Sequence, residues 1–223
     1  MADARNRDYV VVGAPDVNAT GGLLLGDVQK NSTNFPKDAS SELPAGLNAK
    51  PAGFIGEDGL TKTVDRSTEK IKDWNKDTVI VLETDHSVVV KFTFLEAANA
   101  NVLRAVYGAD NVTIEGRNIT VADAAGELPH FSFVGELNGG EGKKGRVFVP
   151  DAQVTSVGDI TFQKDDVIKY EVEIECFAVD NKKFIAHFEV PEGTDSPAGS
   201  TDGDSPAGDS PAGSTDGDAG ASA

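Results

Sequence analysis

The chain has very few of the residues on which covalent or metal-based stability depends. Cys176 is its one cysteine, which excludes an intrachain disulfide. The three histidines, His86, His130 and His187, lie far apart, and no local spacing of Cys, His and carboxylate residues indicates zinc. We therefore expect no metal and no cofactor, and a fold of about 190 residues that depends on its own apolar core.

Long apolar runs are missing as well. The longest are Tyr9–Val12, Val79–Leu82 and Val88–Val90, and each is far too short to cross a bilayer. The opening residues, MADARNRDY, are charged and lack the apolar core of a secretory signal. We expect a protein that is made in a cytoplasm and has no membrane partner.

Motifs for enzyme chemistry are also lacking. Residues 139–144 (GGEGKK) lack the glycine spacing of a phosphate-binding loop and the Ser or Thr that follows its lysine, and predicted strands flank them. A hairpin turn is expected there instead. Cys176 is expected to be a buried thiol, and Trp74 is expected to pack on a sheet edge. We infer that the chain is not an enzyme; the alternative is an acidic hydrolase whose paired carboxylates are distant in sequence.

Basic residues are outnumbered. The net charge is −17, and seven of the 37 acids lie from Glu192 onward, where there is no Lys or Arg. The other 30 acids accompany 20 bases, which argues against a protein that grips nucleic acid through its phosphates. Two interpretations stay open: the acidic balance serves solubility, or it keeps DNA from sticking to a surface past which it slides.

Residues 1–58 combine short apolar runs with loop chemistry. Tyr9–Val12 and Leu23–Leu25 have strand length and are followed or preceded by Gly and Pro. Residues 29–52 contain three prolines and little periodicity, which predicts a long loop. We interpret residues 1–58 as an N-terminal arm with short strands and a long loop that has little core of its own.

Residues 59–191 are predicted to form a β-sandwich or barrel. Val79–Glu83 and Ser87–Leu95 are apolar, β-branched or aromatic, and the polar residues 84–86 between them are expected to be a hairpin connection. Turns separate several later strand-like segments, as in sandwiches and barrels. These segments are 112–114, 119–121, 130–137, 146–149, 160–163 and a hairpin over 167–190.

One short helix is predicted near residues 96–107. Its apolar residues recur at helical spacing on one side, and Gly108 is expected to end it in a left-handed conformation. A helix this short is unstable alone, so it must pack against the sheets. The residues of the apolar side are Leu95, Ala98, Val102, Ala105 and Val106.

The clearest alternation in the chain spans residues 170–176. The acids Glu171, Glu173 and Glu175 point to one face, while the intervening residues, Tyr170, Val172, Ile174 and Cys176, point to the other. Because two glutamates would face each other in the predicted hairpin, we expect the acidic face to be wet, either on the outside of the protein or along a water-filled channel.

The predicted hairpin has a definite register. Pairing Cys176 with Ala186 and Ile174 with Phe188 keeps the apolar residues on one face and leaves a three-residue loop over residues 180–182. The same register places Glu173 opposite Glu189 and Glu175 opposite His187.

Residues 192–223 are predicted to be a disordered acidic tail. The segment SPAGSTDGD occurs at 196–204 and again at 210–218. Pro, Gly, Ser and Asp without large apolar residues cannot offset the entropy of the chain. The repeats lack the spaced ligands and closing Glu of a calcium loop, so calcium is not expected.

Two stretches carry a family resemblance. Residues 53–113 join strands, a turn and a short helix, and the opening MADARNRDYVVVGAPDVNATGGLLLG has the form of an N-terminal arm. Both resemble the major tail tube proteins of bacteriophages with long, non-contractile (siphovirus-type) tails, especially phages of actinobacterial hosts. Fold alone would not separate this reading from a β-sandwich decoration or adhesion module of a virion, which is the alternative.

The resemblance implies a structural virion protein. Rings, hexameric by the resemblance, would stack into the tail tube through which the genome is ejected into the host. Long arms and loops would bridge one ring to the next. Because residues 1–28 and 29–52 have little core of their own, we expect both segments to gain their order mainly from neighbouring subunits. The implied partners are further copies of the chain, the tape measure and tail terminator proteins, and DNA that passes without specific binding. Glu171, Glu173 and Glu175 are the candidates for a row of acids on the lumen wall.

Overall fold

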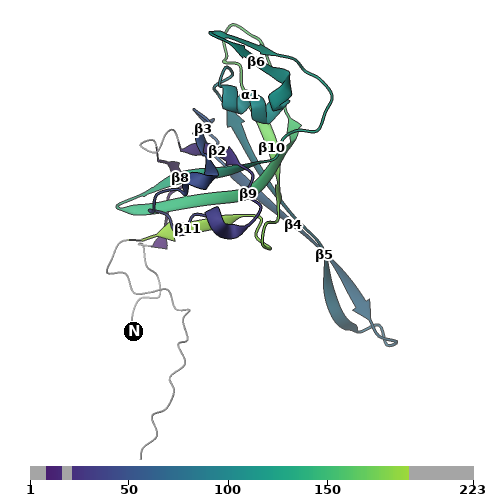
Figure 1. Ribbon diagram of the computed structural model, residues 1–223. Helices are drawn as coiled ribbons and strands as arrows, with labels where there is room; N and C mark the ends of the chain where they lie inside the picture. Colours follow the sequence, from purple (N-terminus) through teal and green to yellow (C-terminus); the bar gives the residue numbers. More distant parts are fainter. Residues whose placement is uncertain (1–8, 17–21, 191–223) are drawn as a thin grey trace, which may run out of the picture. The chain divides into compact units, whose positions relative to one another are not determined.

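The computed structural model describes residues 9–16 and 22–190 (Figure 1). The predicted acidic tail over residues 192–223 lies outside these described residues, as do residues 1–8 and 17–21 of the predicted N-terminal arm. The helix of the described part is α1 (Ala100–Tyr107). The strands are β1 (Ala14–Pro15), β2 (Leu23–Asp27), β3 (Lys50–Pro51), β4 (Thr61–Lys72), β5 (Thr78–Phe94), β6 (Val112–Glu115), β7 (Asn118–Val121), β8 (Phe131–Gly140), β9 (Lys143–Val157), β10 (Tyr170–Phe177) and β11 (Ile185–Glu189).

Nine of the described strands form one antiparallel sheet. Its order is β3-β2-β8-β9-β10-β5-β4, with β1 beside β8 and β11 beside β9. Strands β6 and β7 pair only with each other, close to α1 (Figure 1). This β-rich architecture with one short helix confirms the predicted fold class.

The segment that follows β3 joins the two sides of the sheet. Its start bonds to β2, where the Ala52 N–H donates to the Leu23 carbonyl over 3.0 Å. Its end bonds to β5, where the Gly56 N–H donates to the Thr93 carbonyl over 2.8 Å and Ile55 forms a bridge with Phe94. The sheet is thereby closed into a barrel-like arrangement around the main core.

Alternate residues of β2, β8 and β9 pack into two separate cores on opposite faces of the sheet. Leu23, Phe133 and Val149 belong to the main core, which α1 also joins. Their chain neighbours Leu24, Val134 and Phe148 belong to a second, smaller core on the opposite face. Strands β2, β8 and β9 are therefore buried on both faces where they border both cores, which explains the uninterrupted apolar residues 23–25 and 147–149.

The second core is covered by the long loop of residues 28–49. Phe35 packs edge-on against Phe148, with ring centroids 5.2 Å apart, and Leu47 is fully buried. The prediction that residues 29–52 have little core of their own is therefore wrong. The prolines and polar residues that hide periodicity are compatible with a loop that packs through a few large apolar side chains.

The helix is shorter than predicted. It begins at Ala100 because the Asn99 side chain accepts from the Asn101 N–H over 3.0 Å and caps the first turn. Its apolar side is buried, including Val102 and Val106. Gly108 ends it with a positive φ of 90°, but its ψ of 146° is not that of a left-handed helical residue.

The predicted turn at residues 84–86 is instead part of one continuous strand. β5 runs through it, and its partner is β4. Ser67 pairs with Asp85 and Thr68 with Glu83, so Thr84 is the extra residue of a β-bulge. Polar side chains at a bulge resemble a turn in sequence, which explains the wrong prediction.

The predicted C-terminal hairpin is also wrong. Both β10 and β11 run antiparallel to β9 and pair with successive parts of it: Cys176 lies opposite Ala152, and Ala186 lies opposite Val147. The turn at residues 179–182 is local, with positive φ at Asp180 and Asn181. Turn chemistry alone could not tell a true hairpin from this interruption between two collinear strands.

Two shorter strand predictions fail for lack of a partner strand. Residues 160–163 lie in a loop, with Phe162 exposed. In the N-terminal arm, pairing occurs at Ala14–Pro15 rather than at the apolar residues 9–12. By contrast, the glycine-rich turn predicted at 139–144 is confirmed: it joins β8 to β9, with positive φ at Glu141 and Gly142.

Candidate assembly surfaces

The outer half of the β4–β5 hairpin has exposed apolar side chains on both faces. Figure 1 shows this ribbon projecting beyond the other strands. Ile71 lies opposite Ile80 across the ribbon. An isolated two-stranded ribbon is at best marginally stable in water, and clustered exposed apolar groups mark an interaction surface. The exposed apolar residues of this ribbon, 44–66% accessible, are Ile71, Val79, Ile80, Val81 and Leu82.

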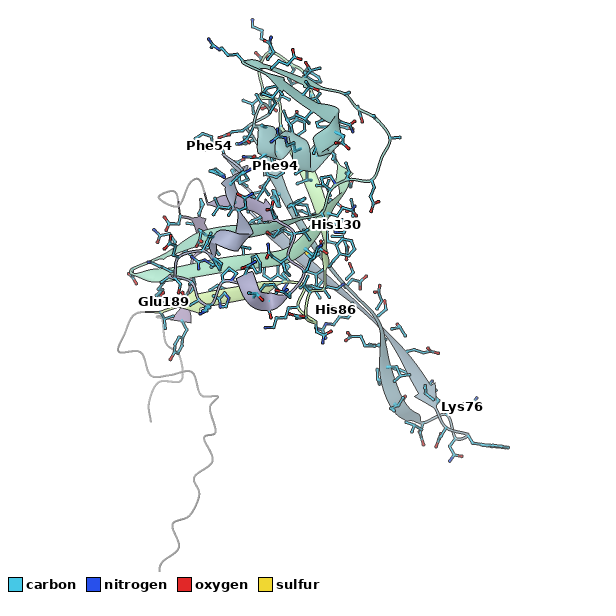
Figure 2. All side chains as sticks on the ribbon, in the orientation of Figure 1. Phe54, Lys76, His86, Phe94, His130 and Glu189 are labelled. Carbon is cyan, nitrogen blue, oxygen red and sulfur yellow. The ribbon has the colours of Figure 1, made fainter. Side chains whose placement is uncertain are left out.

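The tip of the hairpin carries the chain's one tryptophan. Asp73 shapes the turn: its carboxylate accepts from the N–H groups of Asn75 and Asp77 over 2.9 and 2.8 Å. Trp74, which follows Asp73 in the sequence, is 100% exposed. The prediction that Trp74 packs on a sheet edge is therefore wrong within this chain. Figure 2 shows Lys76 at this far end and His86 nearer the sheet.

The acidic row lies on β10, in the middle of the sheet rather than in a hairpin. Its alternation is as predicted: Tyr170, Val172, Ile174 and Cys176 are buried and the three glutamates point to the other face. Because β10 pairs with β5 and β9, Glu173 faces Lys91 and not Glu189, and Glu175 faces Val89 and not His187. The predicted pairing of like charges does not occur.

Neighbouring side chains partly compensate the acidic row. Glu173 forms an ion pair with Lys91, and the Lys169 ammonium lies 3.8 Å from the Glu171 carboxylate. The Ser87 hydroxyl donates to Glu175 at 2.9 Å. Exposed ion pairs of this kind contribute about 0–1 kcal/mol each, so they tune the charge of this face more than they stabilise the fold.

A buried cation ties the long loop to the sheet. Arg146 on β9 donates to the Glu136 carboxylate over 2.9 Å and to the Asp38 carbonyl over 2.8 Å. Burial raises the pKa of Glu136, and Arg146 opposes that rise. Hydrogen bonds from Ser41, by its hydroxyl and N–H, and from the Ser40 N–H lower the pKa of the Asp38 carboxyl to about 2.

A largely apolar cavity of about 1050 Å³ opens beside the barrel. Its walls come from the N-terminal arm, the segment after β3 and the sheet, and include Phe54, Leu60, Phe133 and Phe184. Carboxylates line it in part, among them Glu57 and Asp58 at exposed positions. No sequence pattern pointed to this cavity, because its lining residues come from distant segments.

The histidines and the cysteine have structural surroundings. The His130 Nδ1 lies 2.6 Å from the Asp151 carboxylate, whereas His86 and His187 belong to other strands. Within residues 9–16 and 22–190, no group of His, Cys, Asp and Glu could hold a metal ion. Cys176 is buried, as predicted, and that burial raises the pKa of its thiol to about 12. No helix of this described part is long and apolar enough to cross a membrane.

The surface that β4 forms with β5 was not predicted from the sequence. β4 reads TKTVDRSTEKIK, a polar sequence in which every residue is exposed. Alternation of apolar and polar residues, the usual strand signal, is absent because neither face of the ribbon reaches the core. The one available signal was the apolar segment at residues 79–82, which has strand length but no buried partner.

Comparison with known proteins identifies the family. Residues 8–200 match the phage tail tube protein family. The cryo-EM structure of the anti-feeding prophage cap (AFP tube terminating cap) is similar over 85% of this chain and 100% of that chain, with 10% identity and a TM-score of 0.42. The PVC sheath-tube complex of an extracellular contractile injection system is similar over 82% and 99%, with 10% identity and a TM-score of 0.41. No curated protein matches the chain.

The family match covers most of the chain, including every strand described above. It selects the tail tube over the decoration or adhesion module. Tail tube proteins are structural and not enzymatic, which confirms the expected absence of enzyme activity. The chain belongs to the phage tail tube protein family and is a structural component of the virion's tail tube.

Proposed function

We propose that this chain forms hexameric rings that stack into the tail tube of a siphovirus-type phage of an actinobacterial host, and that the genome passes through this tube. The observation that carries the self-assembly is the β4–β5 ribbon, whose apolar residues are left uncovered by residues 9–16 and 22–190. In a tube of identical subunits, the same ribbon is covered in every copy, so the cost of its exposure disappears on assembly.

The acidic row is the proposed lumen wall. Glu171, Glu173 and Glu175 lie on one exposed sheet face with the hydroxyl-bearing residues Thr93 and Ser87 of β5. A wall of this kind, repeated around each ring, repels phosphates evenly and offers DNA little to bind. Lys91 and Lys169 moderate that repulsion without reversing its sign. The tape measure and tail terminator proteins are the proposed partners at this lumen and at the tube end.

Electron microscopy of the purified full chain tests the assembly. We expect stacked rings or tubes, and cryo-EM averaging along the tube axis should give sixfold rings with β10 facing the lumen. The matched control is a variant with Ile80 and Leu82 changed to Thr, which removes exposed apolar surface but keeps β propensity. It should stay folded and monomeric. A wild-type chain that remains a monodisperse monomer at high concentration contradicts the proposal.

A further inference from the structure

We propose that Trp74, at the hairpin tip of one subunit, inserts into the apolar cavity of a second copy of this chain. The proposal rests on the proposed function, because it names the contact that joins the subunits. It also gives the fully exposed tryptophan and the apolar cavity a common role.

The cavity suits an indole ring. Its volume of about 1050 Å³ lies just above the range for pockets that hold small organic molecules, about 300–1,000 Å³, so an indole ring has ample room. Phe54, Leu60 and Phe184 provide apolar and aromatic wall. A tryptophan buries about 150–250 Å² and is among the commonest anchors of protein interfaces.

The charges of the two surfaces are complementary. Residues 70–77 of the tip, KIKDWNKD, contain three lysines and two aspartates. The cavity lining has the opposite balance: besides the Glu136 that is paired with Arg146, it contains Glu57, Asp58 and Glu96 against one base, Lys62. Opposite charges at a rim guide the approach and fix the orientation of the partner.

The tip cannot reach the cavity of its own chain. Lys62, which lines the cavity, and Trp74 are separated by most of β4. A strand rises about 3.3 Å per residue, so they lie about 40 Å apart. Figure 2 agrees, because Phe54 and Lys76 lie far apart in it. A tip that fills this cavity therefore belongs to a second copy, and such a head-to-tail contact generates rings or filaments.

Tryptophan fluorescence tests the insertion directly, because Trp74 is the one tryptophan of the chain. We expect its emission to shift to shorter wavelength on assembly and its quenching by acrylamide to fall several-fold. Tubes whose Trp74 is quenched as readily as the monomer's overturn the proposal. Protection that needs other tail proteins, and is missing in tubes of the pure chain, also overturns it, because the occupant is then a different protein.

Cross-linking locates the contact. Asn75→Cys places a thiol beside the retained tryptophan, and Asp58→Cys places one at the cavity rim. When the two single variants are mixed and assembled, a short bismaleimide should join them into a heterodimer. The control pair, Asn75→Cys with Glu115→Cys on β6, should give none. Tubes without the rim heterodimer overturn the cavity contact and leave the proposed function standing, whereas a wild-type chain that forms no rings or tubes contradicts the proposed function itself.

Substitution of the anchor completes the test. Trp74→Ser should raise the protein concentration needed for assembly at least about tenfold, and Trp74→Phe should raise it less. Neither should alter thermal unfolding of the monomer, because the side chain is fully exposed there. Assembly of Trp74→Ser at the wild-type concentration overturns the proposal.

Discussion

At the scale of single residues, burial decides which side chains matter to the fold and which to assembly. Leu47 and Leu82 are the same residue type, yet Leu47 is fully buried in the second core and Leu82 is 44% exposed on the ribbon. Their contrast separates the two roles within one chain.

Leu47→Ala should lower the free energy of unfolding by about 2–5 kcal/mol, because it leaves a cavity where the long loop covers the sheet. Leu82→Ala, its matched control, should change the free energy of unfolding of the monomer by less than about 0.5 kcal/mol. Urea denaturation of the two variants measures both values. Equal effects of the two substitutions would contradict the role assigned to the loop.

The buried pair of Glu136 and Arg146 predicts a pH dependence. The folded pKa of Glu136 is raised above 4.5 by burial. The folded state therefore holds this proton more tightly than the unfolded state, and the group's contribution is present below about pH 4.5 and lost as the pH rises through its folded pKa. Glu136→Gln should lose this pH dependence, so its melting temperature relative to that of the wild type should rise between pH 4 and pH 7. A relative melting temperature that stays constant or falls between the two pH values would contradict this sign.

Replacing Arg146 should destabilise the fold at neutral pH. Arg146→Met leaves Glu136 without its counter-charge and frees the Asp38 carbonyl, which should lower the free energy of unfolding by about 3–5 kcal/mol at neutral pH. Replacing both partners, Glu136→Leu with Arg146→Met, should recover most of that loss. Chemical denaturation of Glu136→Leu, Arg146→Met and the double variant measures the free energy of unfolding of each and so gives the interaction energy of the pair.

At the scale of elements, sequence patterns located the strands better than they paired them. The alternation over residues 170–176 predicted the buried and exposed faces of β10 correctly. Its neighbours could not be read from it, because two apolar strands in sequence fit a hairpin as well as they fit two successive partners of β9. The candidate assembly surfaces were harder to predict from the sequence than the strands. The alternation that places the acidic row on one face of β10 could be recognised. The ribbon and the cavity could not, because β4 has no apolar pattern and the cavity is built from segments far apart in sequence.

The β10 face can be tested by removing its charge at constant shape. The variant Glu171→Gln, Glu173→Gln, Glu175→Gln should still form tubes, because these side chains lie outside the core. DNA ejection from phage carrying it should be slowed, since the wall repels phosphates less. The control removes three exposed acids from loops, Asp123→Asn, Glu127→Gln and Asp165→Asn. Ejection kinetics that are the same in both variants and in the wild type would exclude the acidic wall.

At the scale of the whole molecule, the described residues account for the fold without the acidic tail. The family match ends at residue 200, within the repeats. Residues 192–223 contain no Lys, Arg or large apolar residue, so truncation after Pro191 should remove seven negative charges and leave the melting temperature and tube formation unchanged. Calorimetry and electron microscopy of the truncated chain measure the two. Failure to assemble would assign the tail a structural role.

The position of β9 has a consequence for the order of synthesis. Strand β8 precedes β9 in the chain and pairs with one edge of it. The other edge of β9 has no partner until β10 and β11 have been synthesised, and β11 ends at Glu189. On the ribosome, that edge stays open while more than thirty residues emerge after Val157. An open apolar edge is a template for wrong pairing between chains. Nascent chains that stall between β9 and β11 are therefore the species most prone to aggregate during infection.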